Sequence, residues 1–253
     1  MVDRLSLLKP VFASITRIFA NVENLIGMKI TYYGQSCFGV EISGKHLLFD
    51  PFITPNELAS HIKLADLKAD YILVSHGHSD HIADCIQLAK QTGATVIAAF
   101  EVAMWVNKQG VEKYHPMNHG GKWKFDFGTV KCTNAIHSSA LPDGSYGGNP
   151  MGFIVTTADK SFYYSGDTAL TMDMQLVPRW ASLDFAVLPI GDNFTMGYED
   201  AIMAAEMIQC KNILGVHYDT FGFIKIDHEK VEKAFADAGL NLFLPAIGES
   251  IDL

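Results

Sequence analysis

The sequence predicts a single α/β domain built from layers of strands and helices, and three observations support this prediction. The chain has 253 residues, of which 49% are hydrophobic, so it can bury one large core. Short strand-like runs and helical patterns interleave along the chain without internal repeats or a Ser/Pro-rich linker, which favours one layered domain. Polar residues suited to chemistry follow several of the apolar runs, as they do in many α/β folds.

The individual elements are predicted from Met28 onward, where runs of β-branched and aromatic residues are separated by turn residues. Strands are predicted at residues 29–33, 37–42, 46–49, 71–74, 95–98, 122–126, 129–134, 151–157, 161–165, 185–189, 212–216 and 242–244. Helices are predicted at residues 85–91, 102–109, 199–209 and 228–238. Ser43 and Gly44 predict a hairpin turn, and the Gly- and Pro-rich residues 138–149 predict a lid-like loop.

Residues 1–27 have a different pattern and are predicted to form an amphipathic helix ahead of a domain that spans residues 28–253. Apolar residues recur there with alternating spacings of three and four, which is a helical stripe. They are Leu5, Leu8, Phe12, Ile15, Phe19, Val22 and Ile26. Three roles stay open for this helix: docking on its own domain, self-association into a homo-oligomer, or contact with a membrane surface.

Charge and cysteine content narrow the classes of partner. The formal net charge is −9 and the only arginines are Arg4, Arg17 and Arg179, so we expect no binding of extended nucleic acid, which needs a basic stripe. No apolar run approaches the roughly 18 residues of a transmembrane segment. The four cysteines form no Cys-x-x-Cys pair, which predicts free thiols and a cytoplasmic protein. The expected partner is a small-molecule substrate.

The strongest functional signal is the segment Ser-His-Gly-His-Ser-Asp-His at residues 75–81, directly after the apolar run 71–74. Packing does not explain three histidines and a carboxylate within six residues. Neutral imidazole and carboxylate are ligands that zinc and similar divalent ions prefer. His76, His78, Asp80 and His81 therefore predict a metal site on a tight loop at a strand end.

Three further candidate ligands also lie just past apolar runs. His137 follows the run 129–136, Asp167 follows 162–165, and His217 follows 213–216. Strand ends are where α/β folds gather functional groups. Each of these residues alone could be a capping or core polar residue, but together with the first motif they predict a shared site.

This series of residues resembles the five motifs of the metallo-β-lactamase superfamily. Asp50, in Leu-Phe-Asp-Pro, looks like the first motif, an aspartate that supports a ligand from behind. The resemblance implies that His76, His78 and His137 bind one ion, that Asp80, His81 and His217 bind the other, and that Asp167 bridges both. It also implies a four-layer αββα sandwich of two mixed sheets with helices outside. Residues 30–38, 116–123, 189–197 and 217–221 are most similar to the UPF0173 metal-dependent hydrolases.

The predicted activity is hydrolysis by a metal-bound hydroxide, with Asp80 and Asp167 as the candidate catalytic carboxylates. Two divalent ions, Zn²⁺ first and Mn²⁺, Ni²⁺ or Fe²⁺ as alternatives, would leave the site cationic and favour ester, lactone or phosphoester substrates. A phosphodiesterase or RNA-processing nuclease on the same scaffold is one alternative. An iron-binding redox protein is another, although 253 residues leave no room for the flavin domain such proteins usually add.

Weaker candidates for substrate binding lie in Gly-rich or strand-end loops: Asn118, His119, Asn193, Thr195 and Tyr218. Turn formation explains the first four equally well, and packing explains Tyr218.

Overall fold

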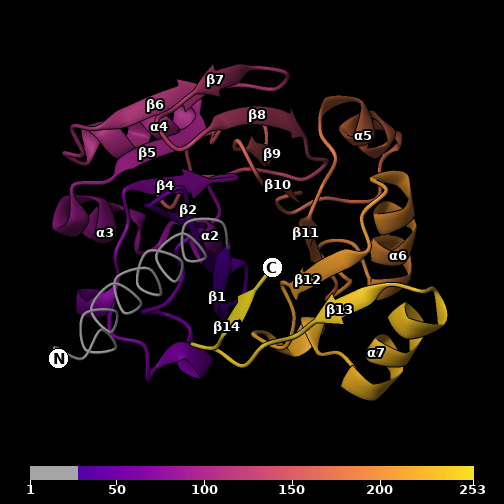
Figure 1. The fold of residues 1–253 in the computed structure, drawn as a ribbon. Helices are drawn as coiled ribbons and strands as arrows, with labels where there is room; N and C mark the ends of the chain where they lie inside the picture. The colour runs from indigo at the N-terminus through magenta and orange to yellow at the C-terminus, as the bar shows by residue number, and fades with distance from the viewer. Residues whose placement is uncertain (1–27) are drawn as a thin grey trace, which may run out of the picture.

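The computed structural model describes residues 28–253 (Figure 1). The predicted helix of residues 1–27 lies outside the described residues, as do its proposed roles. Two seven-stranded sheets form the described part, and helices lie outside them. This confirms the four-layer αββα sandwich.

The first sheet has the order β14-β1-β2-β3-β4-β5-β6. Its strands are β1 (Lys29–Gly34), β2 (Cys37–Ile42), β3 (Lys45–Phe49), β4 (Tyr71–Val74), β5 (Thr95–Ala99), β6 (Tyr114–Met117) and β14 (Ser250–Asp252). Strands β14, β1, β2 and β3 pair antiparallel, whereas β3 to β6 pair parallel. The turn at Ser43 and Gly44 joins β2 to β3 as predicted.

The second sheet has the order β13-β12-β11-β10-β9-β8-β7. Its strands are β7 (Lys122–Lys124), β8 (Thr129–Asn134), β9 (Met151–Thr156), β10 (Ser161–Tyr164), β11 (Phe185–Pro189), β12 (Asn212–Val216) and β13 (Asn241–Phe243). Strands β7 to β10 pair antiparallel and β10 to β13 pair parallel. Both sheets are therefore mixed.

Two strands were missing from the sequence prediction, and both lie at an edge of the first sheet. β6 contains Pro116, which lowers strand propensity because it has no N–H to donate to a neighbouring strand. An edge strand tolerates proline because one of its sides has no neighbour to pair with. β14 has only three residues and follows β13, which belongs to the other sheet. The prediction that residues 242–244 form the last strand was therefore wrong.

The helices pack on the outer faces. They are α2 (Ser79–Ile82), α3 (Cys85–Thr92), α4 (Phe100–Lys108), α5 (Val177–Trp180), α6 (Tyr198–Met207) and α7 (His228–Asp237). The 3-10 helices are η1 (Glu57–Ala59), η2 (Leu64–Asp66), η3 (Met172–Leu176) and η4 (Gly222–Ile224). Helix α4 contacts β5 and β6, while α6 contacts β11 and α7 contacts β13. No described helix is long and apolar enough to span a membrane.

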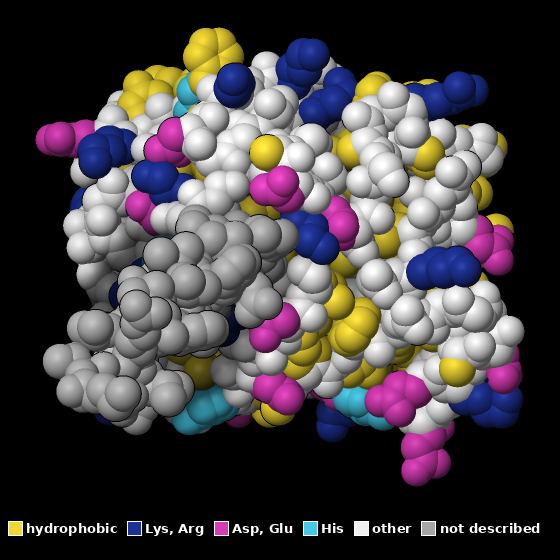
Figure 2. Space-filling model, viewed as in Figure 1, with side chains coloured by type: hydrophobic (Ala, Val, Ile, Leu, Met, Phe, Trp, Pro, Cys, Tyr) yellow, Lys and Arg dark blue, Asp and Glu magenta, His cyan; other side chains and the backbone are white. Residues whose placement is uncertain are grey.

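The core between the sheets is rich in aromatic rings. Phe49 of β3 lies 5.7 Å from Phe162 and 5.8 Å from Tyr164, both on β10, in edge-to-face geometry. Such pairs add to the stabilisation that burial provides. All four cysteines are free and buried, as predicted. On the described part of the face in Figure 2, basic and acidic side chains are mixed.

The topology brings the chemically important loops to one edge of the sandwich. Strands β3 and β4 are parallel neighbours. Strands β8 and β10 are each antiparallel to β9, so they run in the same direction, and β12 is parallel to them through β11. The loops that carry Asp50, His76, His137, Asp167 and His217 all follow the carboxyl ends of these strands. Residues from distant parts of the sequence can thus converge.

Candidate metal centre

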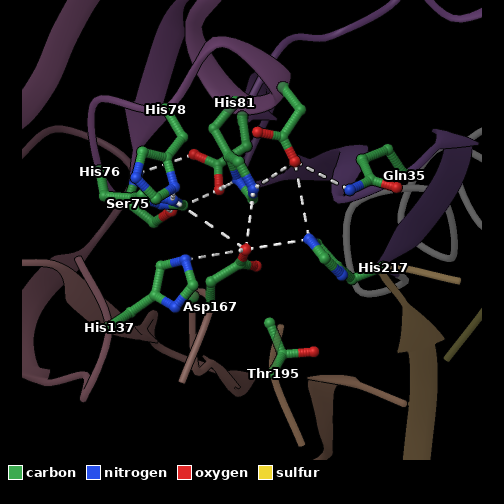
Figure 3. A network of polar contacts seen from close by, with 12 residues as sticks. Gln35, Ser75, His76, His78, His81, His137, Asp167, Thr195 and His217 are labelled. Atoms are coloured by element: carbon green, nitrogen blue, oxygen red, sulfur yellow. Dashed lines mark hydrogen bonds and ion pairs between the residues drawn. The ribbon is translucent and has the colours of Figure 1, made fainter. Parts of the chain in front are cut away.

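The structure brings all seven predicted ligands together in two adjacent groups (Figure 3). Within each group, the candidate ligand atoms lie within 4.8 Å of one another. One group, here called the imidazole group, consists of His76, His78 and His137. The other, here called the carboxylate group, consists of Asp80, His81, Asp167 and His217.

A network of hydrogen bonds orients the rings that lie deepest. The hydroxyl of Ser75 donates to Asp50 Oδ2 over 2.6 Å, and it lies 2.9 Å from Nδ1 of His76. Because its one hydrogen is used on Asp50, Ser75 can only accept from His76. His76 therefore carries its proton on Nδ1 and presents the lone pair of Nε2 to the imidazole group, where Nδ1 of His78 lies 3.0 Å away.

Asp50 supports the second buried ring in the same way. Its Oδ2 lies 2.8 Å from Nδ1 of His81 and also accepts from the hydroxyl of Tyr164 over 2.5 Å. The backbone amide of Ser75 donates to the other oxygen over 2.7 Å. Asp50 is thus saturated with donors, and its contact with His81 leaves Nε2 of that ring free to bind an ion.

Gln35 is a site residue that the sequence reasoning missed. Its side-chain amide donates to Asp80 Oδ2 over 2.9 Å, and its carbonyl accepts from the backbone amide of His217 over 2.9 Å. The residue lies in the turn between β1 and β2, within the segment that resembles the UPF0173 proteins. No chemistry-bearing motif singles it out.

Three of these residues have backbone conformations that L-residues rarely adopt. The φ angles are 53° at Gln35, 41° at Asp50 and 57° at His217. The loop of His217 also packs closely on Gly191, where a Cβ would lie 2.0 Å from the carbonyl of His217. Strained conformations held by the surrounding structure cluster at functional sites.

Asp167 lies where the two groups meet. Its Oδ2 is 3.0 Å from Nε2 of His217 and 3.1 Å from Nε2 of His81 in the carboxylate group. The same oxygen is 3.8 Å from His137 and 4.0 Å from His76 in the imidazole group. One carboxylate oxygen is therefore within ligand reach of both groups.

The electrostatics of the two groups differ. Burial lowers the pKa of all three rings in the imidazole group, so they are neutral and able to bind metal. Burial would also lower the pKa of His81, but the surrounding carboxylates prevail and hold it well above its ordinary value. For the same reason the pKa of His217 rises to about 9. The carboxylate group therefore attracts positive charge, which protons or a divalent cation can supply.

The residues fit divalent ions. Oδ1 of Asp167 and Nδ1 of His217 are buried and have no hydrogen-bond partner among the described residues. Leaving such atoms unpaired costs about 1–3 kcal/mol each, whereas coordination to an ion would satisfy the carboxylate oxygen. The donors are imidazoles and carboxylates, which suit zinc and similar ions.

Five of the seven ligands, namely His78, Asp80, His137, Asp167 and His217, line a pocket of about 840 Å³. That volume is in the range of small-molecule sites. Its described lining is Pro55, Asn56, Glu57, Leu58, His78, Asp80, His137, Ser138, Asp167, Phe194, His217, Thr220, Phe221, Gly222 and Phe223. Most of the residues around the mouth were not predicted, because their side chains carry no reactive group.

None of the predicted substrate-binding residues lines this pocket. Asn118 and His119 form a turn, in which the side chain of Asn118 accepts from the amide of His119 over 2.9 Å. The ring of His119 lies 2.7 Å from the carbonyl of Pro150. Tyr218 is buried and stacks on Tyr32 at 6.1 Å. Turn formation and packing account for these contacts, and a role of the three residues in binding substrate stays a prediction.

In the loop after β11, the pocket is lined by the residue between the two predicted ones and not by the predicted residues themselves. Asn193 is exposed, and its backbone amide donates to the side-chain carboxylate of Asp192. The hydroxyl of Thr195 donates to the carbonyl of Met196 over 3.4 Å, and Figure 3 draws no contact between Thr195 and the ligands. Phe194 lies between them and lines the pocket. Sequence reasoning favoured the polar residues of this loop and overlooked the apolar one.

Comparison with known families and proteins gives consistent matches. Residues 45–218 match a family described as the beta-lactamase superfamily domain. A UPF0173 metal-dependent hydrolase from Christiangramia forsetii is 56% identical over 227 residues, which cover 89% of this chain and all of the relative. The UPF0173 metal-dependent hydrolase YtkL from Bacillus subtilis is 47% identical, with the same coverage of both chains.

A solved structure is also similar. Igni18, a metallo hydrolase from the archaeon Ignicoccus hospitalis, has 30% sequence identity and a TM-score of 0.81. The match covers 90% of this chain and 98% of Igni18.

Proposed function

The chain belongs to the UPF0173 metal-dependent hydrolases of the metallo-β-lactamase superfamily, and we propose that it hydrolyses a small ester, lactone or phosphoester with two divalent ions as cofactors. The position of Asp167 carries this proposal. Its Oδ2 lies within 4.0 Å of Nε2 in His76 and within 3.0 Å of Nε2 in His217. It thus lies between two ligand groups and lines the pocket.

The imidazole group would hold one ion and Asp80, His81 and His217 the other, with Asp167 shared between them. When bound, divalent ions lower the pKa of coordinated water towards about 7 and polarise a carbonyl or phosphoryl oxygen. The donors are five imidazoles and two carboxylates, a set that zinc binds well, so Zn²⁺ is the first choice, with Mn²⁺, Ni²⁺ and Fe²⁺ as alternatives. The free cysteines support a cytoplasmic location.

The protein's own residues bind, orient and give access. Asp50 fixes His81 directly and His76 through Ser75, so both rings present Nε2 to the centre. Asp80 and Asp167 line the pocket and have a lowered pKa. They are ionised at neutral pH, so their role is to supply negative charge and accept hydrogen bonds rather than to donate protons.

A combined metal and activity assay tests the proposal. Protein stripped with a chelator and reloaded with defined Zn²⁺, Mn²⁺, Ni²⁺ or Fe²⁺ would be assayed on a carboxyl ester, a lactone, a thioester and a phosphodiester. We expect up to two ions per chain and hydrolysis that returns with metal. Saturation at a single ion would contradict the two-ion assignment, and a fully loaded protein that cleaves none of these bonds would contradict the hydrolase.

A further inference from the structure

The mouth of the pocket is lined by large apolar side chains that are exposed to solvent. Leu58 is 51% exposed, Phe194 50%, Phe221 39% and Phe223 78%. Here they are called the apolar rim. Exposed apolar groups gathered at one concave place are typical of a surface that binds something.

The rim is assembled from three separate loops. Leu58 belongs to η1, Phe194 follows β11, and Phe221 and Phe223 lie at η4. The rings of Phe194 and Phe223 meet edge to face at 6.3 Å, and Phe221 lies 6.3 Å from the buried Phe52. These contacts fix the rings in the lining of the same pocket that His78, Asp80, His137, Asp167 and His217 line, so a molecule bound at the centre can also contact the rings.

The charge of the lining restricts what can bind there. Apart from the ligand groups, the charged residue of the described lining is Glu57, next to Leu58. Neither lysine nor arginine occurs among the described lining residues. A negatively charged substituent on the substrate would therefore meet an acidic, apolar mouth with no cation to pair with.

We propose that the substrate is a carboxylic ester, open or cyclic, whose uncharged acyl or aryl group packs on the apolar rim; this inference rests on the proposed hydrolase activity. Water adds its hydroxyl to the acyl carbon, the acyl C–O bond breaks, and the leaving oxygen takes the remaining hydrogen. The products are a carboxylic acid and an alcohol from an open ester, or a single hydroxy acid from a cyclic one. A phosphodiester has no acyl group to pack on the apolar rim and is therefore the poorer substrate.

Chain length is the first test. On zinc-loaded protein, kcat/KM for p-nitrophenyl esters should rise about fourfold for each methylene added from acetate to octanoate until the rim is covered. The double variant Phe194→Ala/Phe223→Ala should lose about tenfold on the octanoate, mainly in KM, and stay within about twofold on the acetate. Met172→Ala, which removes an exposed side chain outside the described lining, should match the wild type on both esters.

Charge is the second test. The p-nitrophenyl monoester of octanedioic acid has the length of the octanoate but ends in a carboxylate. We expect at least about tenfold lower kcat/KM for it, and Glu57→Lys should reduce that difference to about threefold. Equal rates for the charged and uncharged esters, or no dependence on chain length, would overturn the inference while the hydrolase remains established.

A binding measurement separates the two proposals. The neutral fluorophore N-phenyl-1-naphthylamine should bind the loaded wild type and Met172→Ala alike, and bind the double phenylalanine variant at least about fivefold more weakly. If neither an ester, a lactone, a thioester nor a phosphodiester is cleaved but the fluorophore binds in this way, the hydrolase fails and the apolar site stands. If the phosphodiester is cleaved faster than every ester and the fluorophore binds all variants equally, the inference fails and the hydrolase stands.

Discussion

The two ligand groups lie side by side but are held by different chemistry. The imidazole group is neutral, and its deepest ring, His76, is oriented through the hydroxyl of Ser75. The carboxylate group contains two ionised aspartates, and His81 is oriented by direct contact with a third, Asp50. Gln35 supports only the carboxylate group.

Some supporting contacts are made by one group only, and others are made by both groups. Ser75 contacts a ring of the imidazole group, and Gln35 contacts an aspartate of the carboxylate group. Asp50 supports one ring in each group, and Asp167 lies within ligand reach of both. Substitutions should therefore weaken one ion, the other, or both, according to the contact removed. The following experiments test that division.

The largest effect is expected at Asp167. Asp167→Ala and the isosteric Asp167→Asn should each lower the affinity for both ions by more than about a hundredfold and abolish turnover, because loss of a supporting residue alone costs about 10–100-fold. Chelator competition and elemental analysis measure this. Asp159→Ala, at an exposed aspartate, is the control. An active Asp167→Asn protein with both ions bound would show that the groups do not share this residue.

One imidazole from each group provides a matched pair. His137→Ala should lower the affinity of the imidazole group for its ion by about a hundredfold, and His217→Ala should do the same to the carboxylate group. Each variant should have a smaller effect on the other ion, because both groups share Asp167. His81→Ala should resemble His217→Ala. Metal titrations of the variants would show these losses. If both variants weakened the same ion, the division into two groups would be wrong.

Removing a support should cost less than removing a ligand. Asp50→Asn keeps the shape of the side chain but weakens the hold on both rings, so both affinities should fall by about 10–100-fold. Ser75→Ala should affect only the imidazole group, by about tenfold, and leave the contact of Asp50 with His81 in place. Metal competition compares the two variants, with circular dichroism as a control for folding. Equal losses at both ions in Ser75→Ala would refute the separate supports.

Gln35 should have a smaller and more selective effect. Gln35→Met keeps the length of the side chain and removes the 2.9 Å hydrogen bond to Asp80. We expect the carboxylate group alone to lose up to about tenfold in affinity. The titration that resolves both ions is the measurement. Unchanged binding would mean that Asp80 does not need this donor.

The smallest effect on the centre is expected from deleting residues 1–27. All seven ligands and Asp50 follow Met28, whose amide and carbonyl pair with Leu253 at 3.3 Å and 3.0 Å. A chain that begins at Met28 should keep its metal content and rate. Light scattering, thermal melting and liposome sedimentation would show whether self-association, docking or membrane contact is lost. Loss of bound metal would make the segment part of the catalytic fold.

The ligand types and the elements that carry them could be predicted from local patterns in the sequence. Histidine and aspartate just after apolar runs indicate both a metal-binding chemistry and a strand end, and each signal is local. Strands β2, β4, β8, β11 and β12 have the predicted bounds, because β4, β11 and β12 are mainly buried apolar runs and β2 and β8 contain alternating buried positions. The edge strands β6 and β14 depend on a partner strand instead, so the prediction missed them.

The residues that surround the ligands could not be predicted from local sequence, because their positions depend on contacts between distant segments. A phenylalanine in the sequence predicts burial, and nothing local distinguishes the buried Phe235 from the exposed Phe223. Phe194 and Phe223 belong to loops after two different strands, and their rings meet at 6.3 Å while both side chains stay exposed. Gln35 contacts Asp80, and Tyr218 stacks on Tyr32, because folding brings these distant segments together. Ligand chemistry belongs to the residue itself, whereas exposure and partnership belong to the contacts that folding creates between distant segments.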